Sequence, residues 1–138
     1  MRSLFLLPLL FSLFLSPLEA CDDQLIPLDE LSREKIHSRY FSKSQSEKGA
    51  IQYLIGLVRE SNATFIRNGK KHTSFQAAKL LEYKQRKLSA STVTAEEFVR
   101  YAASYSSTSG EPYYLQYSSQ KKCPLGRILI NELEAVKY

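Results

Sequence analysis

The sequence predicts a small α+β domain that is mainly helical and carries a short hairpin or two to three short strands. Residues that cap helices precede apolar segments with helical spacing at three places. Asn68-Gly69, the pair best able to hold positive φ at both centres of a type I′ turn, lies between residues 64–67 and 70–73. Residues 113–118 alternate as a strand does, so helices and short strands share one chain.

Residues 1–20 predict a cleavable signal peptide, which implies export. Arg2 supplies the positive end, residues 4–15 form the apolar stretch, and Ala20 is the small residue at the cut. A membrane anchor needs about 20 apolar residues, and Pro8 and Pro17 leave this stretch short and broken. We therefore expect three parts: a signal peptide at 1–20, an N-terminal lead-in with a helix at 21–44, and a single α+β domain at 45–138.

The two cysteines allow two chemistries. Leu18, Glu19, Ala20 and Cys21 stand in the order of a bacterial lipobox, in which the cysteine is acylated and anchors the protein to a membrane. Glu19 departs from that pattern, because its position is normally small or apolar. The alternative is a disulfide between Cys21 and Cys123 in an oxidising compartment. We place acylation first, and the sequence leaves both open.

The chain carries 19 Lys and Arg against 14 Asp and Glu, a net charge of +5 that removal of residues 1–20 does not change. The basic residues are spread along the chain instead of forming the stripe typical of nucleic-acid binding, and an exported protein meets little nucleic acid. A solvated charged surface is the simplest interpretation. If the charge serves a partner, an acidic protein or an anionic envelope surface fits it better than nucleic acid.

Two helices are predicted in the first half of the chain. Residues 28–41 keep a loose helical spacing through Leu28, Leu31, Ile36 and Tyr40. The Ser44-Gln45-Ser46-Glu47 segment is a capping box for a helix that continues to about Glu60.

Three more helices are predicted after the hairpin. Thr73 to Gln76 is a second capping box, and the helix behind it carries Phe75, Ala77, Ala78, Leu80 and Leu81. Thr94 to Glu97 is a third, before a helix whose predicted buried side is Phe98, Tyr101, Ala102 and Tyr105. Pro124 starts the last helix, on Leu125, Leu129, Leu133 and Val136.

Four motifs, read in order, carry a family resemblance: Phe65 to Gly69, His72-Thr73, Thr94 to Val99, and the SSTSGEPY segment at 106–113. With them the chain resembles the YfeK-like family of small exported bacterial proteins, a domain family of unknown function, over about residues 45–135. The resemblance implies a bacterial source, a signal peptide or lipoprotein leader, and no established activity or cofactor. Where that family often has Glu-Ala and then His-Leu, this chain has Gln76-Ala77 and Leu80-Leu81, which argues against a catalytic role for that helix.

The hairpin turn is the first candidate binding segment. Arg67, Lys70, Lys71 and His72 gather positive charge there, and the Arg67 guanidinium could grip a carboxylate or phosphate through two hydrogen bonds. The alternatives are a charged turn in water, or an Arg67 that ties the turn to a neighbouring loop.

The serine-rich segment at 104–110 is the second candidate. It offers hydroxyls and backbone donors, and a left-handed Gly110 could close a nest for an anion. The alternative is a helix end followed by a turn. If the two segments meet in space, they form one ligand site, for which the candidate residues are Arg67, Asn68, Gly69, His72, Ser107, Ser109 and Gly110.

These observations favour an exported bacterial envelope protein that is a non-enzymatic binding module for an anionic or protein partner. The alternative is a small periplasmic hydrolase in which His72 activates a serine of the 104–109 loop, but Ser107 and Ser109 lie in no Gly-x-Ser-x-Gly elbow. The histidines and cysteines lack ligand spacing, so we expect no metal and no cofactor. The module would be free in the periplasm, or reach a membrane only through a lipidated Cys21.

Overall fold

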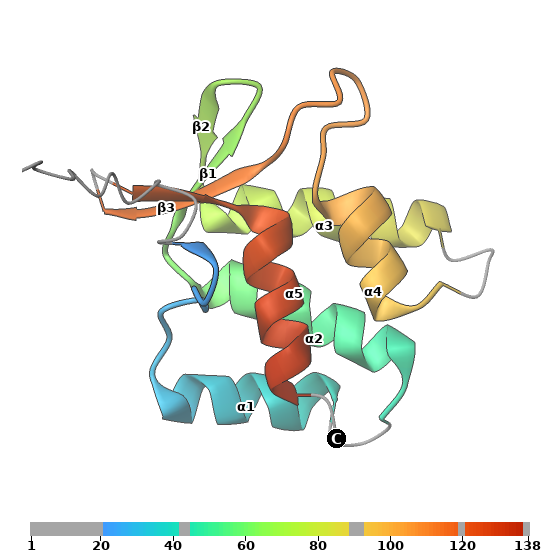
Figure 1. The fold of residues 1–138 in the computed structure, drawn as a ribbon. Helices are drawn as coiled ribbons and strands as arrows, with labels where there is room; N and C mark the ends of the chain where they lie inside the picture. Colours follow the sequence, from blue (N-terminus) through green and yellow to red (C-terminus); the bar gives the residue numbers. More distant parts are fainter. Residues whose placement is uncertain (1–20, 42–44, 89–92, 119–120, 137–138) are drawn as a thin grey trace, which may run out of the picture.

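Five α-helices, one π-helical turn and a four-stranded sheet make up the chain, in a computed structural model that describes residues 21–41, 45–88, 93–118 and 121–136. Figure 1 shows the sheet at one end of the molecule and the helices packed beside and below it. The predicted α+β class is confirmed, whereas the predicted signal peptide lies outside the described residues. The elements in chain order are α1 (Glu30–Tyr40), α2 (Glu47–Glu60), β1 (Thr64–Arg67), β2 (Lys70–His72), α3 (Ser74–Leu88), α4 (Ala95–Phe98), the π-helical η2 (Val99–Ala103), β3 (Tyr114–Ser118), β4 (Lys121–Pro124) and α5 (Leu125–Val136).

The sheet has the strand order β2-β1-β3-β4, and each neighbouring pair is antiparallel. The predicted hairpin is present: Arg67 pairs with Lys70, and Asn68 and Gly69 have φ angles of 50° and 75°. Strand β3 is the strand expected at 113–118. Strand β4 was not predicted from the sequence. Its two lysines are exposed, and it is defined only by its pairing with β3.

Helix α2 forms the centre of the core, because other helices cover it on several sides. It packs against α1, α3, α4 and α5, and both Leu54 and Leu57 are fully buried. One face of the sheet adds Phe65 to the same core. Gly56 lets α1 cross α2 closely, since a Cβ at this position would lie 2.8 Å from Cγ2 of Ile36.

The predicted capping box at Thr73–Gln76 has both of its hydrogen bonds, and the one at Thr94–Glu97 has the bond to the Thr94 hydroxyl. Thr73 Oγ1 accepts a hydrogen bond from the N–H of Gln76 at 3.1 Å, and Gln76 Oε1 accepts one from the N–H of Thr73 at 2.9 Å. Thr94 accepts from the N–H of Glu97 at 3.1 Å. Each contact satisfies a backbone donor at a helix start.

The box expected at residues 44–47 is wrong. Helix α2 begins at Glu47, and its cap is Ser46, which accepts from the N–H of Gly49 at 3.0 Å. The Glu47 carboxylate accepts from the N–H of Ala95 at 2.6 Å, 48 residues further along the chain. It therefore helps to cap α4, which local spacing could not reveal.

Several side chains expected to be buried are exposed. Tyr101 is 80% exposed and Tyr105 48%, because the helix after Thr94 becomes π-helical at Val99–Ala103 and the i→i+5 pattern turns other residues inward. Phe75, at the start of α3, is 54% exposed. Leu31 is 59% exposed, on a helix whose one buried residue is Ile36.

Residues 21–41, here called the N-terminal clasp, pack against the rest of the molecule. Arg33 of α1 donates two hydrogen bonds to the fully buried carboxylate of Glu132 in α5, at 2.7 and 2.8 Å. Ile26 donates its N–H to the same carboxylate at 2.7 Å. The clasp is thus joined to α5 by a buried ion pair with several partners.

A disulfide joins Cys21 of the clasp to Cys123 of β4, with their Cα atoms 5.6 Å apart. This is the alternative that the sequence placed second to acylation. The pairing depends on the N-terminal clasp, which runs back across the fold and places Cys21 beside the edge strand β4. Within this disulfide, Cys21 has no free thiol that could be acylated.

Candidate functional site

The two candidate segments meet in space through Asn68, at the hairpin turn. Ser109 Oγ donates to Asn68 Oδ1 at 2.5 Å, and Asn68 Nδ2 donates to Ser106 Oγ at 3.4 Å. Asn68 has a left-handed φ of 50°, and its side chain reaches the loop through these two contacts. The turn and the serine-rich loop are therefore one structural unit.

The loop closes on itself like a hairpin. Tyr105 and Pro112 form an isolated β-bridge, and the N–H of Ser106 bonds to the carbonyl of Glu111 at 2.9 Å. Gly110 has the positive φ expected of it, 73°, and donates its N–H to the carbonyl of Ser106 at 2.8 Å. Since these donors are used within the loop, the expected anion nest does not form from them. Ser107 lies exposed at the loop tip.

Arg67 lies on the inner face of β1, two residues after the buried Phe65. Tyr113 is fully buried, with its ring 5.0 Å from that of Phe65. Lys84 of α3 places Nζ 4.7 Å from the centre of the Tyr113 ring. We call Arg67, Lys84, Tyr113 and Ser106 the cationic cluster.

Lys84 joins α3 to the start of the loop. Its Nζ donates to the carbonyls of Ala102 and Tyr105, each at 2.8 Å. Carbonyls at a helix end carry partial negative charge, so a lysine is well placed there. Lys84 thereby fixes the position of the loop against the sheet.

The charges of the cluster are not balanced. Burial lowers the pKa of Lys84, and the nearby positive charge of Arg67 lowers it further. Burial raises the pKa of Tyr113, while Arg67 and Ser106 act in the opposite direction. No carboxylate contributes to either shift, so two cations share a partly buried space.

Two polar atoms of the cluster are buried without a hydrogen-bond partner among the described residues: Nε of Arg67 and the hydroxyl of Tyr113. The Tyr113 hydroxyl lies near Arg67 and Ser106, but neither has the geometry of a hydrogen bond to it. A buried donor without a partner costs about 1–3 kcal/mol. The arrangement therefore offers two unused donors beside two positive charges.

His72 does not join this cluster. It pairs with Phe65 on the edge strand, and their ring centres are 6.2 Å apart. The Phe65–His72 pair lies three residues from Asn68, about 10 Å along an extended strand. In the described part of the chain, no hydrogen bond joins His72 to a hydroxyl of residues 104–109, so the hydrolase alternative gains no support.

Lys84, Tyr113 and Ser106 are the site residues that sequence reasoning missed. A signal for Lys84 was available: it lies at an inward position of α3, three residues after the buried Leu81. A lysine there interrupts the apolar side of a helix. Tyr113 gave no such signal, because its ring fits the expected strand pattern.

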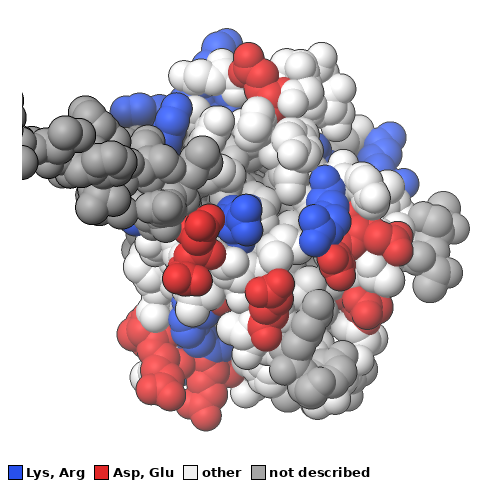
Figure 2. All heavy atoms as spheres, in the orientation of Figure 1, with Lys and Arg blue, Asp and Glu red and all other residues white. Residues whose placement is uncertain are grey.

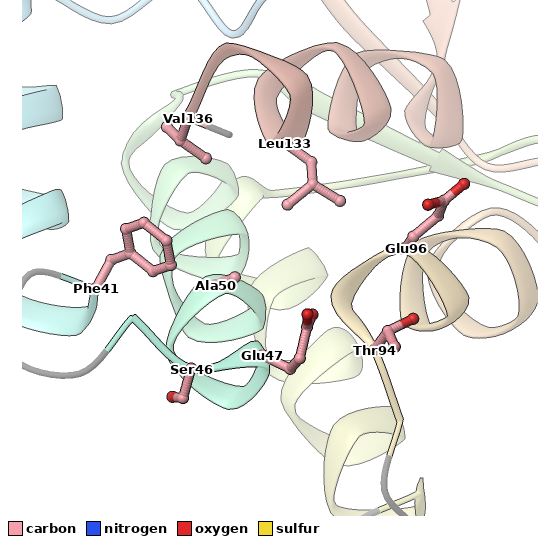
Figure 3. Close-up of a pocket in the computed structure, with 8 residues that line it drawn as sticks. All are labelled: Phe41, Ser46, Glu47, Ala50, Thr94, Glu96, Leu133 and Val136. Atoms are coloured by element: carbon pink, nitrogen blue, oxygen red, sulfur yellow. The ribbon is translucent and has the colours of Figure 1, made fainter. Parts of the chain in front are cut away.

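Hollows also lie elsewhere in the described part of the molecule. One, of about 250 Å³, lies between the starts of α2 and α4 and the end of α5, with the Glu47 and Glu96 carboxylates at its rim (Figure 3). The Glu47 carboxylate caps α4 there, which is a structural task. Another is a groove of about 870 Å³ beside the neck of the loop, lined in part by Tyr101, Tyr105 and Arg127. A third, of about 230 Å³, lies between α1, α2 and α3 and is lined in part by Arg59 and Glu82.

The described residues contain no group of three or more side chains arranged to hold a metal ion. None of the described helices combines the length and apolar character needed to span a membrane.

Comparison with known proteins gives one match. The model of a family of unknown function, DUF5329, matches residues 45–137, which include the whole cationic cluster and exclude the N-terminal clasp. Neither a curated protein nor a solved structure matches the chain.

Proposed function

The chain belongs to the DUF5329 family of unknown function, and we propose that this member is a non-enzymatic binding protein that holds an anionic group at the cationic cluster. The observation that carries the proposal is the uncompensated charge of Arg67 and Lys84 beside two buried donors without partners. The nearby like charges and the buried donors without partners each lower the stability of the fold. A bound anion would offset both costs.

The chemistry favours a carboxylate or a phosphate. Arg67 would donate to the anion from its guanidinium, including the unused Nε, and the Tyr113 hydroxyl would donate from the other side. Lys84 already donates to two carbonyls, so it would add mainly positive charge. Asn68 would hold the loop in place through its contacts with Ser106 and Ser109.

We further propose that the protein is an exported member of the bacterial cell envelope, as its resemblance to the YfeK-like proteins implies. The signal-peptide pattern of residues 1–20 supports export. The Cys21–Cys123 disulfide supports an oxidising compartment such as the periplasm, and it favours a free protein over a lipid-anchored one. The partner would be an acidic protein or an anionic surface.

The test is a titration followed by NMR, with inorganic phosphate and acetate as probes. We expect the amide signals of residues 67–69 and 106–111 to shift in the wild-type chain. Arg67→Ala should remove those shifts with little change in melting temperature, because Arg67 supports no ion pair in the described structure.

Lys71→Ala is the matched control. Lys71 pairs with Ile66, so it lies on the opposite face of the hairpin from Arg67, and the variant loses the same charge. Equal loss of the shifts in both variants would mean general attraction to a basic protein. A large fall in melting temperature for Arg67→Ala would make Arg67 structural and overturn the proposal.

A further inference from the structure

The outer face of helix α3 carries an unusual pattern of exposed side chains. Phe75, Lys79, Tyr83 and Lys87 follow one another at intervals of four residues, which places them in one row along the helix. The row, here called the α3 stripe, is about 18 Å long at 1.5 Å per residue. Phe75 is 54% exposed and Tyr83 is 50% exposed, so both rings face solvent.

Each lysine of the α3 stripe lies over the ring that precedes it. Lys79 Nζ is 5.1 Å from the centre of the Phe75 ring, and Lys87 Nζ is 5.4 Å from that of Tyr83. The result is a continuous surface in which rings and ammonium groups alternate. Its residues differ from those of the cationic cluster, so an argument from the α3 stripe does not depend on the anion site.

The α3 stripe contains no acidic residue. The one acid of α3, Glu82, is paired with Arg59 of α2. The face of the molecule in Figure 2 is different, because acidic and basic side chains are interspersed on it. Helix α3 carries Lys79, Lys84, Arg86 and Lys87 against the single acid Glu82, so positive charge predominates along it.

We infer that the α3 stripe docks the protein on an anionic phospholipid surface. Charge complementarity requires an anionic partner, and none of the hollows described above is lined by a residue of the α3 stripe, so a flat partner fits better than a small molecule. Aromatic rings favour the boundary between lipid headgroups and acyl chains, while lysines extend to the headgroup phosphates. A helix face that alternates the two suits a bilayer better than an acidic protein.

The test compares the binding of the full chain to phosphatidylcholine vesicles with and without phosphatidylglycerol, at low and high salt. We expect binding to require phosphatidylglycerol and to weaken as salt rises. Lys79→Gln with Lys87→Gln should lower the phosphatidylglycerol-dependent affinity about 25-fold, at about fivefold per lysine. Residues 1–20 are the same in every variant, so differences between the variants report on the α3 stripe.

Lys35→Gln with Lys48→Gln is the matched control. It removes the same charge from exposed positions of α1 and α2, and we expect its affinity to stay within about twofold of wild type. Phe75→Ser leaves the charge unchanged and should weaken binding about tenfold. Melting temperatures should match in all these variants.

Three results would overturn the inference. One is an equal loss of binding in the two lysine pairs, which would indicate net charge alone. Another is equal binding to both vesicle types by the wild-type chain. The third is an acidic protein partner whose capture depends on the α3 stripe while the vesicles do not bind.

Discussion

The N-terminal clasp and the cationic cluster differ in whether a buried positive charge has a carboxylate partner. In the clasp, Arg33 meets the fully buried Glu132 through two hydrogen bonds, and Ile26 donates a third. In the cationic cluster, burial and the nearby charge of Arg67 lower the pKa of Lys84, and no carboxylate offsets that effect. The first arrangement is complete within the chain, whereas we propose that an anion from outside completes the second.

The contrast is between a buried charge that stabilises the fold, at Arg33, and buried charges that we propose bind a ligand, at Arg67 and Lys84. A buried ion pair whose donors and acceptors are satisfied holds elements together, and the loss of one partner is costly. Like charges placed together lower stability, so they persist where they serve binding. The following predictions test whether the two regions differ in this way.

The largest effect is expected from Arg33→Met. It leaves the fully buried Glu132 carboxylate without its charged partner, which should lower the free energy of unfolding by about 3–5 kcal/mol. Urea unfolding measures this loss. The double variant Arg33→Met with Glu132→Leu is the control, and it should regain most of the loss. A single variant within about 1 kcal/mol of wild type would show that the pair does not hold the clasp.

The disulfide is expected to contribute slightly less. Cys21→Ser with Cys123→Ser should lower the free energy of unfolding by about 2–4 kcal/mol, because the bridge spans 102 residues and restricts the unfolded chain. Urea unfolding of the oxidised wild-type chain and of the double variant measures the difference in the free energy of unfolding. Mass spectrometry of the mature N-terminus adds an independent check, since an acylated Cys21 would contradict the bridge.

The cationic cluster should respond weakly. Arg67→Met should change the free energy of unfolding by less than about 1 kcal/mol, because it removes a buried donor without a partner and a repulsion with Lys84. The same urea experiment applies. A loss as large as that for Arg33→Met would erase the distinction between the two regions.

The smallest effect is on pH dependence. The pKa of Lys84 lies below the ordinary 10.5, so between the lowered value and 10.5 the unfolded chain binds more protons than the folded one. Stability from this group therefore rises with pH across that interval. NMR titration of the Lys84 side chain reads the pKa, which Arg67→Met should raise. An unchanged pKa in that variant would remove Arg67 as a cause.

Local rules predicted the parts of the fold that local interactions create. The Thr73–Gln76 capping box and the Asn68-Gly69 turn formed as expected, because each needs only a few neighbouring residues. Glu47 did not form the expected box, since its carboxylate reaches α4 instead. The same limit explains Tyr101, whose exposure depends on a π-helical turn that residue spacing does not announce.

The candidate site divides in a similar way. Arg67 and Asn68 could be selected from the sequence, since a positive turn and a serine-rich loop are visible there. Lys84 could not be joined to them, because α3, β1 and the loop meet only in the folded chain. His72 was predicted to join the site because it is close to Arg67 in sequence, but it lies outside the cationic cluster.

By itself, the sequence determined the α+β class, the hairpin turn and the capping of two helices. These follow from backbone preferences and short-range hydrogen bonds, which neighbouring residues carry. Only the tertiary structure decided that Cys21 pairs with Cys123, that Glu132 balances Arg33, and that Arg67 and Lys84 stand together. The physical reason is that electrostatics and burial act across space, between groups that the chain brings together only when it folds.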